Sequence, residues 1–341
     1  MLRVLFSFTA MFMISSPSID PAGAQGNFYA GKTITIVSHG GVGNNYDTYA
    51  RMLVRHLGKH IPGRPKLMVV NMPGDGGVIA TNYVAKGVPQ DGTTFQIVSD
   101  GLLMFDAAGG PGLVSPLNTF KWLGALSSSN AVTATWYKSN IRTLEAAKSR
   151  DVRLGSSAAG ATSSMVPYIY NAFLGTRFVV VQGYLSAPEQ HDAMERGELD
   201  GRGAASWSSF RNLLGQHIDD GKLHPLVQIG LKREVDLPNT PLLLDLAGDD
   251  PKKRAIAMFV SKAMTMSRSV ATGPGVPNER VAILRQALMD VVKDPEFLAE
   301  VHKFRLDTGF VSGADAEALV RDVLSTPKKV VRDAQIAMRS D

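Results

Sequence analysis

The sequence of 341 residues contains no cysteine. This absence excludes disulfide bonds, a thiol nucleophile and a metal site with cysteine ligands, and it leaves no thiol to carry a lipid. Beyond the first residues, no apolar run reaches the roughly 20 residues that a membrane-spanning helix needs. The 36 Lys and Arg residues exceed the 31 Asp and Glu residues by only five and form no concentrated basic tract. The composition therefore favours a mildly basic, solvated surface and no nucleic-acid partner.

The motifs of several enzyme classes are missing as well. The sequence has no Gly-Lys-Ser/Thr phosphate loop, no Gly-x-Ser-x-Gly elbow and no His-Glu-x-x-His pair. Residues 41–43 begin a dinucleotide fingerprint, but Tyr46 stands where its third glycine should be. His56 and His60 have the spacing of two metal ligands on one helix, although a polar helix face is the favoured interpretation. We therefore expect no catalytic residues, no metal and no cofactor.

The first 24 residues predict a secretory signal peptide. Arg3 supplies a positive charge, residues 4–14 form a mainly apolar run, and the Ala-Gly-Ala at residues 22–24 matches the small-x-small pattern of a cleavage site. A buried N-terminal helix is the alternative interpretation. We expect a mature protein that begins at Gln25 and resides in the periplasm.

The most informative stretch joins a predicted strand, a glycine-rich loop and a predicted helix. Residues 33–37 are β-branched or apolar, which predicts a buried strand. The loop at residues 38–43 follows, and Asn44 or Asn45 can cap a helix whose apolar residues recur at helical spacing as far as Leu57. Free backbone N–H groups at such a helix start favour an anion.

The same arrangement recurs along the chain. Residues 68–77 contain a second glycine-rich loop after a strand, and residues 93–101 end in a third loop. Residues 152–164 run from a strand into small and hydroxyl residues before another helix, whereas the last third is predicted to be mostly helical, with helix starts near Asn278 and Ser312. Strands that alternate with helices predict a mainly parallel sheet, whose loops bind ligands at one edge.

Together these motifs resemble the extracytoplasmic solute receptors of tripartite tricarboxylate transporters, the TctC-like or Bug family. The resemblance covers nearly all of the predicted mature chain, in order, through the stretches TIVSHGGVGNNYDTYARML, VNMPGDGG, VPQDG, LGSSAAGATSSM, GYLSAP, GELD and DPEFL. Asp47 and Arg51 stand where the family's helix has them. His39, Asp75 and Leu185 depart from the family's pattern, and Gly-Arg-Gly-Ala at residues 201–204 replaces a segment that usually holds an aspartate.

The resemblance implies an α/β fold of the periplasmic binding protein type II kind, with two α/β lobes and a ligand cleft between them. Lobe 1 is predicted at residues 27–127 and 230–341, and lobe 2 at residues 128–229. Such a receptor captures a small organic carboxylate and delivers it to the membrane permease subunits of an ion-driven transporter. We expect a monomer. A ligand-binding partner of a membrane sensor kinase, and an exported enzyme that reuses the fold, are the alternatives.

The predicted ligand-binding residues come from the loops of both lobes. The loops of lobe 1 contain no Lys or Arg, so we expect backbone N–H groups and hydroxyls to hold one carboxylate. Arg202 can bind a second carboxylate with two hydrogen bonds, or it pairs with Asp200 or Glu198. Trp207 either walls the site or packs in the core. The full set of candidates is Ser38, His39, Gly40, Gly43, Asn44, Asn45, Pro73, Gly74, Asp75, Gly76, Gly77, Ser99, Asp100, Ser156, Ser157, Gly160, Thr162, Ser163, Tyr184 and Arg202.

Overall fold

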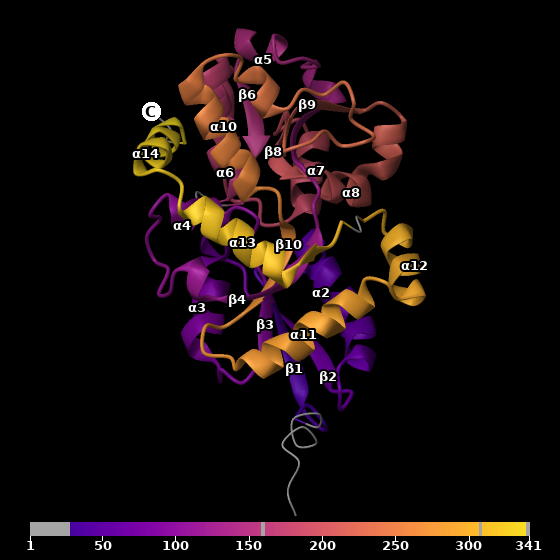
Figure 1. The fold of residues 1–341 in the computed structure, drawn as a ribbon. Coiled ribbons are helices and arrows are strands. Elements are labelled where there is room, and N and C mark those ends of the chain that lie inside the picture. Colours follow the sequence, from indigo (N-terminus) through magenta and orange to yellow (C-terminus); the bar gives the residue numbers. More distant parts are fainter. Residues whose placement is uncertain (1–27, 158–160, 307–308, 339–341) are drawn as a thin grey trace, which may run out of the picture.

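The molecule consists of two β-sheets with helices around them (Figure 1). The computed structural model describes residues 28–157, 161–306 and 309–338. The predicted signal peptide and Gly160 lie outside these residues. We call the parts built on the two sheets the first and the second lobe. The α/β fold class predicted from the sequence is confirmed.

The first sheet has six strands in the order β11-β4-β10-β3-β1-β2. Strand β1 is parallel to β2 and β3, whereas β10 is antiparallel to β3 and β4, and β11 is antiparallel to β4. The strands are β1 (Thr33–Ser38), β2 (Lys66–Asn71), β3 (Thr94–Ile97), β4 (Lys121–Ser127), β10 (Ser267–Thr272) and β11 (Val311–Ser312).

The second sheet has five strands in the order β7-β6-β8-β5-β9. Strand β6 is parallel to β7 and β8, and β5 is antiparallel to β8 and β9. Both sheets are thus mixed, and the predicted mainly parallel arrangement is wrong because the chain crosses between the lobes and returns. The strands are β5 (Ala131–Trp136), β6 (Val152–Gly155), β7 (Phe178–Val181), β8 (Gly201–Ser206) and β9 (Leu223–Ile229).

The helices cover the sheets and bury one apolar face each. In α2, for example, Tyr49, Met52 and Leu53 pack with Ile34 and Ile36 of β1, and all five side chains are fully buried. The helices are α2 (Asn45–His56), α3 (Val78–Asn82), α4 (Leu102–Ala107), α5 (Ala146–Ser149), α6 (Thr162–Leu174), α7 (Ala187–Glu195), α8 (Trp207–Asp219), α9 (Leu243–Leu246), α10 (Pro251–Ala263), α11 (Asn278–Val291), α12 (Pro295–Lys303), α13 (Gly313–Leu324) and α14 (Lys328–Ala337).

The chain passes between the lobes more than once. The segment between β4 and β5 leads from the first sheet into the second, and its Asn130 N–H donates to Glu234 while its Nδ2 donates to Gln228. Helix α10 lies against the second lobe, where Lys253 Nζ donates to the Phe173 carbonyl of α6. The predicted lobe boundaries stay a prediction.

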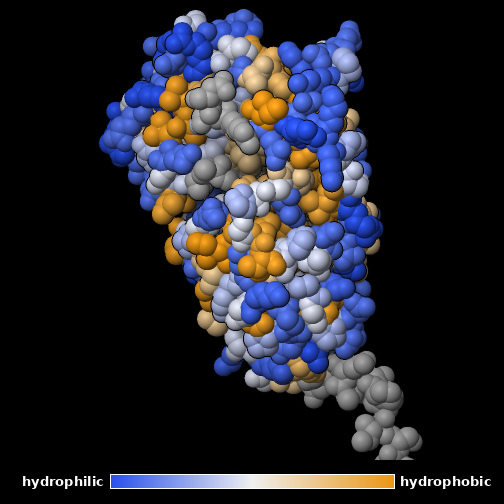
Figure 2. All heavy atoms as spheres, turned by 90° about the vertical axis from the view of Figure 1, so that its left-hand side faces the viewer, coloured by the Kyte–Doolittle hydropathy of each residue, from blue (hydrophilic) through white to orange (hydrophobic). Residues whose placement is uncertain are grey.

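One face of the molecule is mainly hydrophilic with local exceptions (Figure 2). On the face shown in Figure 2, hydrophobic residues gather in several patches with hydrophilic residues between them. In the part of the chain that the structure describes, no helix combines the length and the apolar character needed to cross a membrane.

Candidate ligand-binding site

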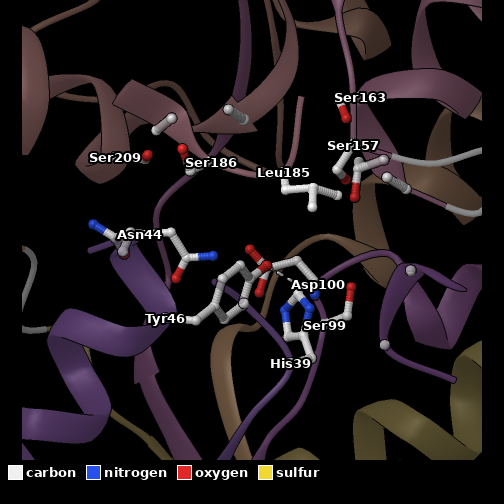
Figure 3. A pocket seen from close by; sticks show the side chains of 18 of the residues that line it. His39, Asn44, Tyr46, Ser99, Asp100, Ser157, Ser163, Leu185, Ser186 and Ser209 are labelled. Carbon is white, nitrogen blue, oxygen red and sulfur yellow. Dashed lines mark hydrogen bonds between the residues drawn. The ribbon is translucent and has the colours of Figure 1, made fainter. Parts of the chain in front are cut away.

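A cavity of about 280 Å³ lies between the two lobes. Its volume is close to the lower end of the roughly 300–1,000 Å³ that is usual for small-molecule sites, so it suits a small organic molecule. In Figure 3, side chains of the first lobe face side chains of the second lobe across this space; the labelled ones are His39, Asn44, Tyr46, Ser99 and Asp100 on one side, and Ser157, Ser163, Leu185, Ser186 and Ser209 on the other.

Most of the predicted site residues lie in the wall of this cavity. Those that line it are His39, Gly40, Asn44, Asn45, Pro73, Gly74, Asp75, Gly76, Gly77, Ser99, Asp100, Ser157, Thr162, Ser163, Tyr184 and Arg202. The first-lobe members share one sheet edge because β1, β2 and β3 run in the same direction. Whether each of them touches a ligand stays a prediction.

Three further candidates do not line the cavity. Ser38 is fully buried, and its Oγ accepts a hydrogen bond from Gly40 N at 3.3 Å. Gly43 N donates to Asp47 at 2.9 Å. Ser156 Oγ lies 2.7 Å from the hydroxyl of Ser163, which does line the cavity. These residues therefore hold lining residues or loop backbone in place.

Asp47 fixes the first loop to the sheet. Besides Gly43 N, its carboxylate accepts hydrogen bonds from Arg51 Nε at 2.8 Å and Asn71 Nδ2 at 2.9 Å. Burial opposes ionisation, but these donors hold the pKa of Asp47 below its usual range. The Asp47–Arg51 pair expected from the sequence is present, and Asn44 caps α2 by accepting from Asp47 N at 3.0 Å.

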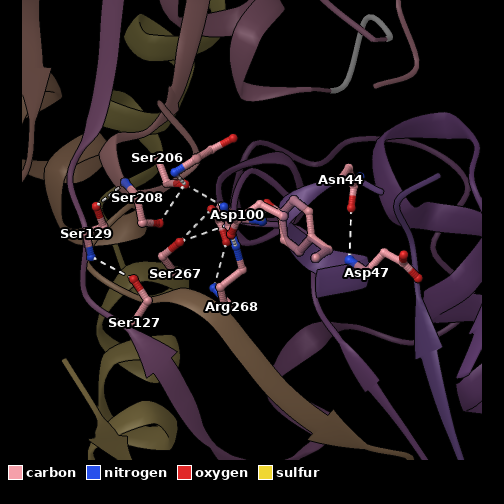
Figure 4. Close-up of polar contacts among 12 residues, drawn as sticks. Asn44, Asp47, Asp100, Ser127, Ser129, Ser206, Ser208, Ser267 and Arg268 are labelled. Carbon is pink, nitrogen blue, oxygen red and sulfur yellow. Dashed lines mark hydrogen bonds and ion pairs between the residues drawn. The ribbon is translucent and has the colours of Figure 1, made fainter. Parts of the chain in front are cut away.

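A buried arginine that the sequence analysis did not identify stands at the centre of the site (Figure 4). Arg268 of β10 is 2% exposed and pairs with Asp100, to which its backbone N–H also donates at 3.0 Å. Its Nε donates to Asn45 Oδ1 at 2.6 Å, and its Nη2 donates to Ser206 of the second lobe. The guanidinium lies 4.0 Å from the centre of the Tyr46 ring. Arg268 thus connects the lobes while its charge is balanced by Asp100.

The second arginine of the cavity has no acidic partner among the described residues. Arg202 of β8 is 5% exposed, donates from Nε to Gln190 Oε1 at 3.0 Å and lies over the Phe210 ring at 4.7 Å. Its Nη1 is buried and makes no hydrogen bond to any described group. Burial, and secondarily the charge of Arg268, lower the pKa of Arg202 to about 10, so it is still a cation at neutral pH.

The alternative role for Arg202 is wrong. The Asp200 carboxylate accepts hydrogen bonds from Arg153 N at 2.8 Å and Arg153 Nε at 3.1 Å. Glu198 pairs with Arg196 at 2.6 Å. Both acids that the sequence offered as partners are therefore bonded to other arginines, whereas Arg202 lines the cavity and its Nη1 has no hydrogen-bond partner among the described groups.

Two polar atoms on the first-lobe side are also unpaired. His39 Nε2 and Asn45 Nδ2 are buried without a hydrogen-bond partner among the described groups. The His39 ring packs against the Tyr46 ring at 4.0 Å, with an angle of 66° between the planes. Burial lowers the pKa of His39 to about 4, so the ring is neutral at pH 7.

We expect His39 to make the protein less stable in mild acid. Because its folded-state pKa of about 4 lies below the ordinary 6.5, the unfolded chain takes up a proton first as the pH falls. His39 should therefore cost roughly 1–3 kcal/mol of stability between pH 6.5 and pH 4, and nothing above pH 7. Urea unfolding of the wild type and of His39→Gln checks this. The free energy of unfolding of the variant should increase relative to that of the wild type as the pH falls from 7 to 4.5. A constant difference between the two would contradict it.

Several lining residues escaped the sequence analysis. Tyr46 was not among the predicted ligand-binding residues, yet it lines the cavity and its hydroxyl accepts from Asp100 N at 3.2 Å. The others lie on α7, on β8 and α8, or on and near β10, and no loop motif in the sequence indicated these elements. They include Gln190, Ser206, Ser209, Met264 and Arg268. The capping box of Ser186 and Glu189, a pattern that can be read from the sequence, was the available signal for the α7 end of the site.

The structure also gives the surroundings of three residues whose roles the sequence left open. Trp207 is a core residue, buried with Phe210, and its Nε1 donates to Asp236 at 2.8 Å. His56 and His60 bond separately, to Glu300 at 2.7 Å and to Asp294 at 2.8 Å. No group of three potential metal ligands occurs within the ranges that the structure describes.

Comparison with known proteins identifies similar chains of nearly the same length. No family model matches the sequence. A UPF0065 protein of Bordetella bronchiseptica is 23% identical over 350 residues, which cover 98% of this chain and 93% of the relative.

The fold of this chain is similar to that of several solved structures, although the sequence identities are low. MatC from Rhodopseudomonas palustris with bound malate has a TM-score of 0.68 at 17% identity, with 88% of this chain and 99% of MatC covered. A second R. palustris protein, solved with adipate, has a TM-score of 0.68 at 19% identity, covering 89% and 98%. A TctC solute-binding protein from Polaromonas has a TM-score of 0.61 at 19% identity, covering 89% and 99%. Together with BugD, these neighbours confirm the resemblance seen in the sequence: the chain has the two-lobed fold of the TctC and Bug solute-binding proteins.

Proposed function

We propose that this protein is a periplasmic receptor of the TctC-like or Bug family, which binds a small organic carboxylate between its lobes and delivers it to a membrane permease. The observation that carries the proposal is Arg202, a buried cation in the cavity wall whose Nη1 has no partner among the described residues. Similar structures hold malate and adipate, both of them carboxylates.

The electrostatics of the cavity support an anionic ligand. A guanidinium without a nearby acid is costly to bury, and a ligand carboxylate would supply the missing charge and hydrogen bonds. The serine hydroxyls of the second lobe add donors close by, since Ser157 and Ser163 also line the cavity. An enzymatic role has no comparable support, because His39 is the one histidine among the described lining residues and its Nε2 is hydrogen-bonded to no described nucleophile.

Export to the periplasm is part of the proposal. The predicted signal peptide would be removed before Gln25, and the proteins with this fold include one named as a periplasmic transporter. The test of binding therefore uses the chain from Gln25 onward.

A thermal-shift screen of the mature protein against aliphatic and aromatic carboxylates tests the binding function. A true ligand should raise the melting temperature in proportion to the logarithm of its concentration, because it stabilises only the folded state. Amines and neutral sugars of similar size serve as controls. No shift with any carboxylate would overturn the proposal. Loss of ligand uptake in cells that lack either the receptor or the permease would support delivery to a transporter, and uptake that persists without the permease would contradict it.

The lobes approach each other closely at Gly101, and this contact gives a test of closure on the ligand. A Cβ atom at Gly101 would lie 2.7 Å from Thr162 Oγ1 and 3.1 Å from Thr162 N across the cleft. Gly101→Ala should therefore hold the lobes apart and weaken binding by about 1–2 kcal/mol, or roughly five- to thirtyfold in Kd. Calorimetry with the tightest carboxylate from the screen measures the change.

Gly41 offers a matched control for this variant. A Cβ atom there would meet Leu185 O of the second lobe at 3.9 Å, which is an ordinary van der Waals contact. Gly41→Ala should therefore bind like the wild type. Equal affinities for all three proteins would show that the close approach at Gly101 does not matter for binding.

A further inference from the structure

The two sides of the cavity differ in charge, and this difference narrows the class of ligand. Among the described residues, four charged side chains line it, namely Asp75, Asp100, Arg202 and Arg268. Asp100 and Arg268 form an ion pair in which both partners are at least nine-tenths buried. Asp75 is exposed at the loop. Arg202 is therefore the one buried charge in the described wall that a ligand is left to balance.

The first-lobe side instead presents neutral hydrogen-bonding groups. Arginine can only donate, so the Asn45 oxygen must face Arg268 Nε and the Asn45 amide N–H₂ must point elsewhere. That N–H₂ group is a buried donor without a described partner. Beside the same Tyr46–Arg268 stack lies His39, whose Nε2 is likewise unpaired. A neutral imidazole has one donor and one acceptor nitrogen.

We propose that the ligand is a monoanion, with one carboxylate on Arg202 and, at its other end, an uncharged group that accepts from Asn45 and exchanges a hydrogen bond with His39. A primary amide or a hydroxyl meets both requirements. This inference rests on the proposed function, since it refines which carboxylate the same cavity takes.

A second carboxylate would be disfavoured at the first-lobe end. It would meet the Asn45 donor but no uncommitted cation, because Arg268 already bonds to Asp100, Asn45 and Ser206. Asp100 also lines the cavity, and its ion pair with Arg268 leaves no net positive charge there to attract a second anion. An unsubstituted hydrocarbon end would instead leave two buried polar atoms without partners.

Nine probes of matched length test this inference by calorimetry at pH 7.5. They are succinate, glutarate and adipate, their monoamides succinamate, glutaramate and adipamate, and the simple acids butyrate, pentanoate and hexanoate. At the best chain length, the monoamide should bind at least about tenfold more tightly than both the dicarboxylate and the simple acid, since each lacks or mismatches one buried hydrogen bond.

Each other result would overturn the inference. A dicarboxylate that binds as tightly as its monoamide would exclude the monoanion, and a simple acid that does so would exclude the polar far end. Binding by none of the nine would overturn it too. The proposed function would survive all three results if the wider carboxylate screen yields a ligand, so the two failures are distinguishable.

A variant of Asn45 tests the uncharged end of the ligand independently of its carboxylate end. Asn45→Asp keeps an oxygen for Arg268 but replaces the free amide donor with an acceptor. The monoamide should lose at least about tenfold in affinity, whereas the simple acid, which has no polar far end, should change less than threefold. A parallel loss for both probes would overturn the assignment of Asn45 to the far end.

Discussion

Replacing Arg268 with methionine should lower the free energy of unfolding by about 3–5 kcal/mol, because it leaves the Asp100 carboxylate buried without its counter-charge. Arg268 is 2% exposed, and besides Asp100 it supplies hydrogen bonds to Asn45 and Ser206. It also adopts a φ of +58°, which non-glycine residues rarely do, so its backbone conformation depends on these contacts. Urea unfolding of the mature protein at pH 7 measures the loss.

Two variants make this prediction specific. The double variant Arg268→Met, Asp100→Asn removes both charges and should recover most of the loss, as replacing a whole buried ion pair usually costs little. Arg55→Met removes the Arg55–Glu300 pair, in which the arginine is 46% exposed, and should cost less than about 1 kcal/mol. If Arg268→Met costs no more than Arg55→Met, the pair does not stabilise the site as described.

The parts of the site that follow local sequence rules could be predicted. The stretch after β1 contains a buried strand, glycines and a capping asparagine in the order that builds a loop at a helix start, and Asn44 does cap α2. The Ser312 cap was found in the same way. At Asn278 the cap position belongs instead to Pro277, and Asn278 is the first helical residue, a shift of one position.

The centre of the first sheet could not be predicted, because its position depends on distant pairing. Strand β10 reads Ser-Arg-Ser-Val-Ala-Thr, with little apolar character, yet all six residues are buried between β3 and β4. Local propensity favours an exposed segment for such a sequence. Arg268 is buried there because its acid partner, Asp100, lies 168 positions earlier in the chain. The antiparallel pairing of β10 also explains why the sheet is mixed.

Arg202 is a residue that the sequence identified as a candidate but whose partner it could not determine. Sequence reasoning identified it as a candidate because a guanidinium can bind a carboxylate with two hydrogen bonds. It could not decide between a ligand and a neighbouring acid, since Asp200 is only two positions away. The geometry decides this point, because Asp200, which directly precedes β8, accepts hydrogen bonds from Arg153 of the adjacent strand β6.

Replacing Arg202 with methionine should weaken binding of the tightest carboxylate by roughly 1.5–3 kcal/mol, or about 10- to 150-fold in Kd. The same change should leave the unliganded protein at least as stable as the wild type, because it exchanges a buried cation without a described acid partner for an apolar side chain. Calorimetry gives the affinity, and urea unfolding without ligand gives the stability.

Arg153 supplies the matched control for this pair of measurements. It lies on the neighbouring strand β6, is 46% exposed and bonds to Asp200, and it does not line the cavity. Arg153→Met should therefore keep the affinity and lose a little stability, which is the reverse of the result expected for Arg202→Met. Unchanged affinity in a folded Arg202→Met protein would remove Arg202 from the ligand site. A lower free energy of unfolding without ligand would show that the contacts with Gln190 and Phe210 are its main role. A side chain whose main role is to bind the ligand does not stabilise the unliganded protein.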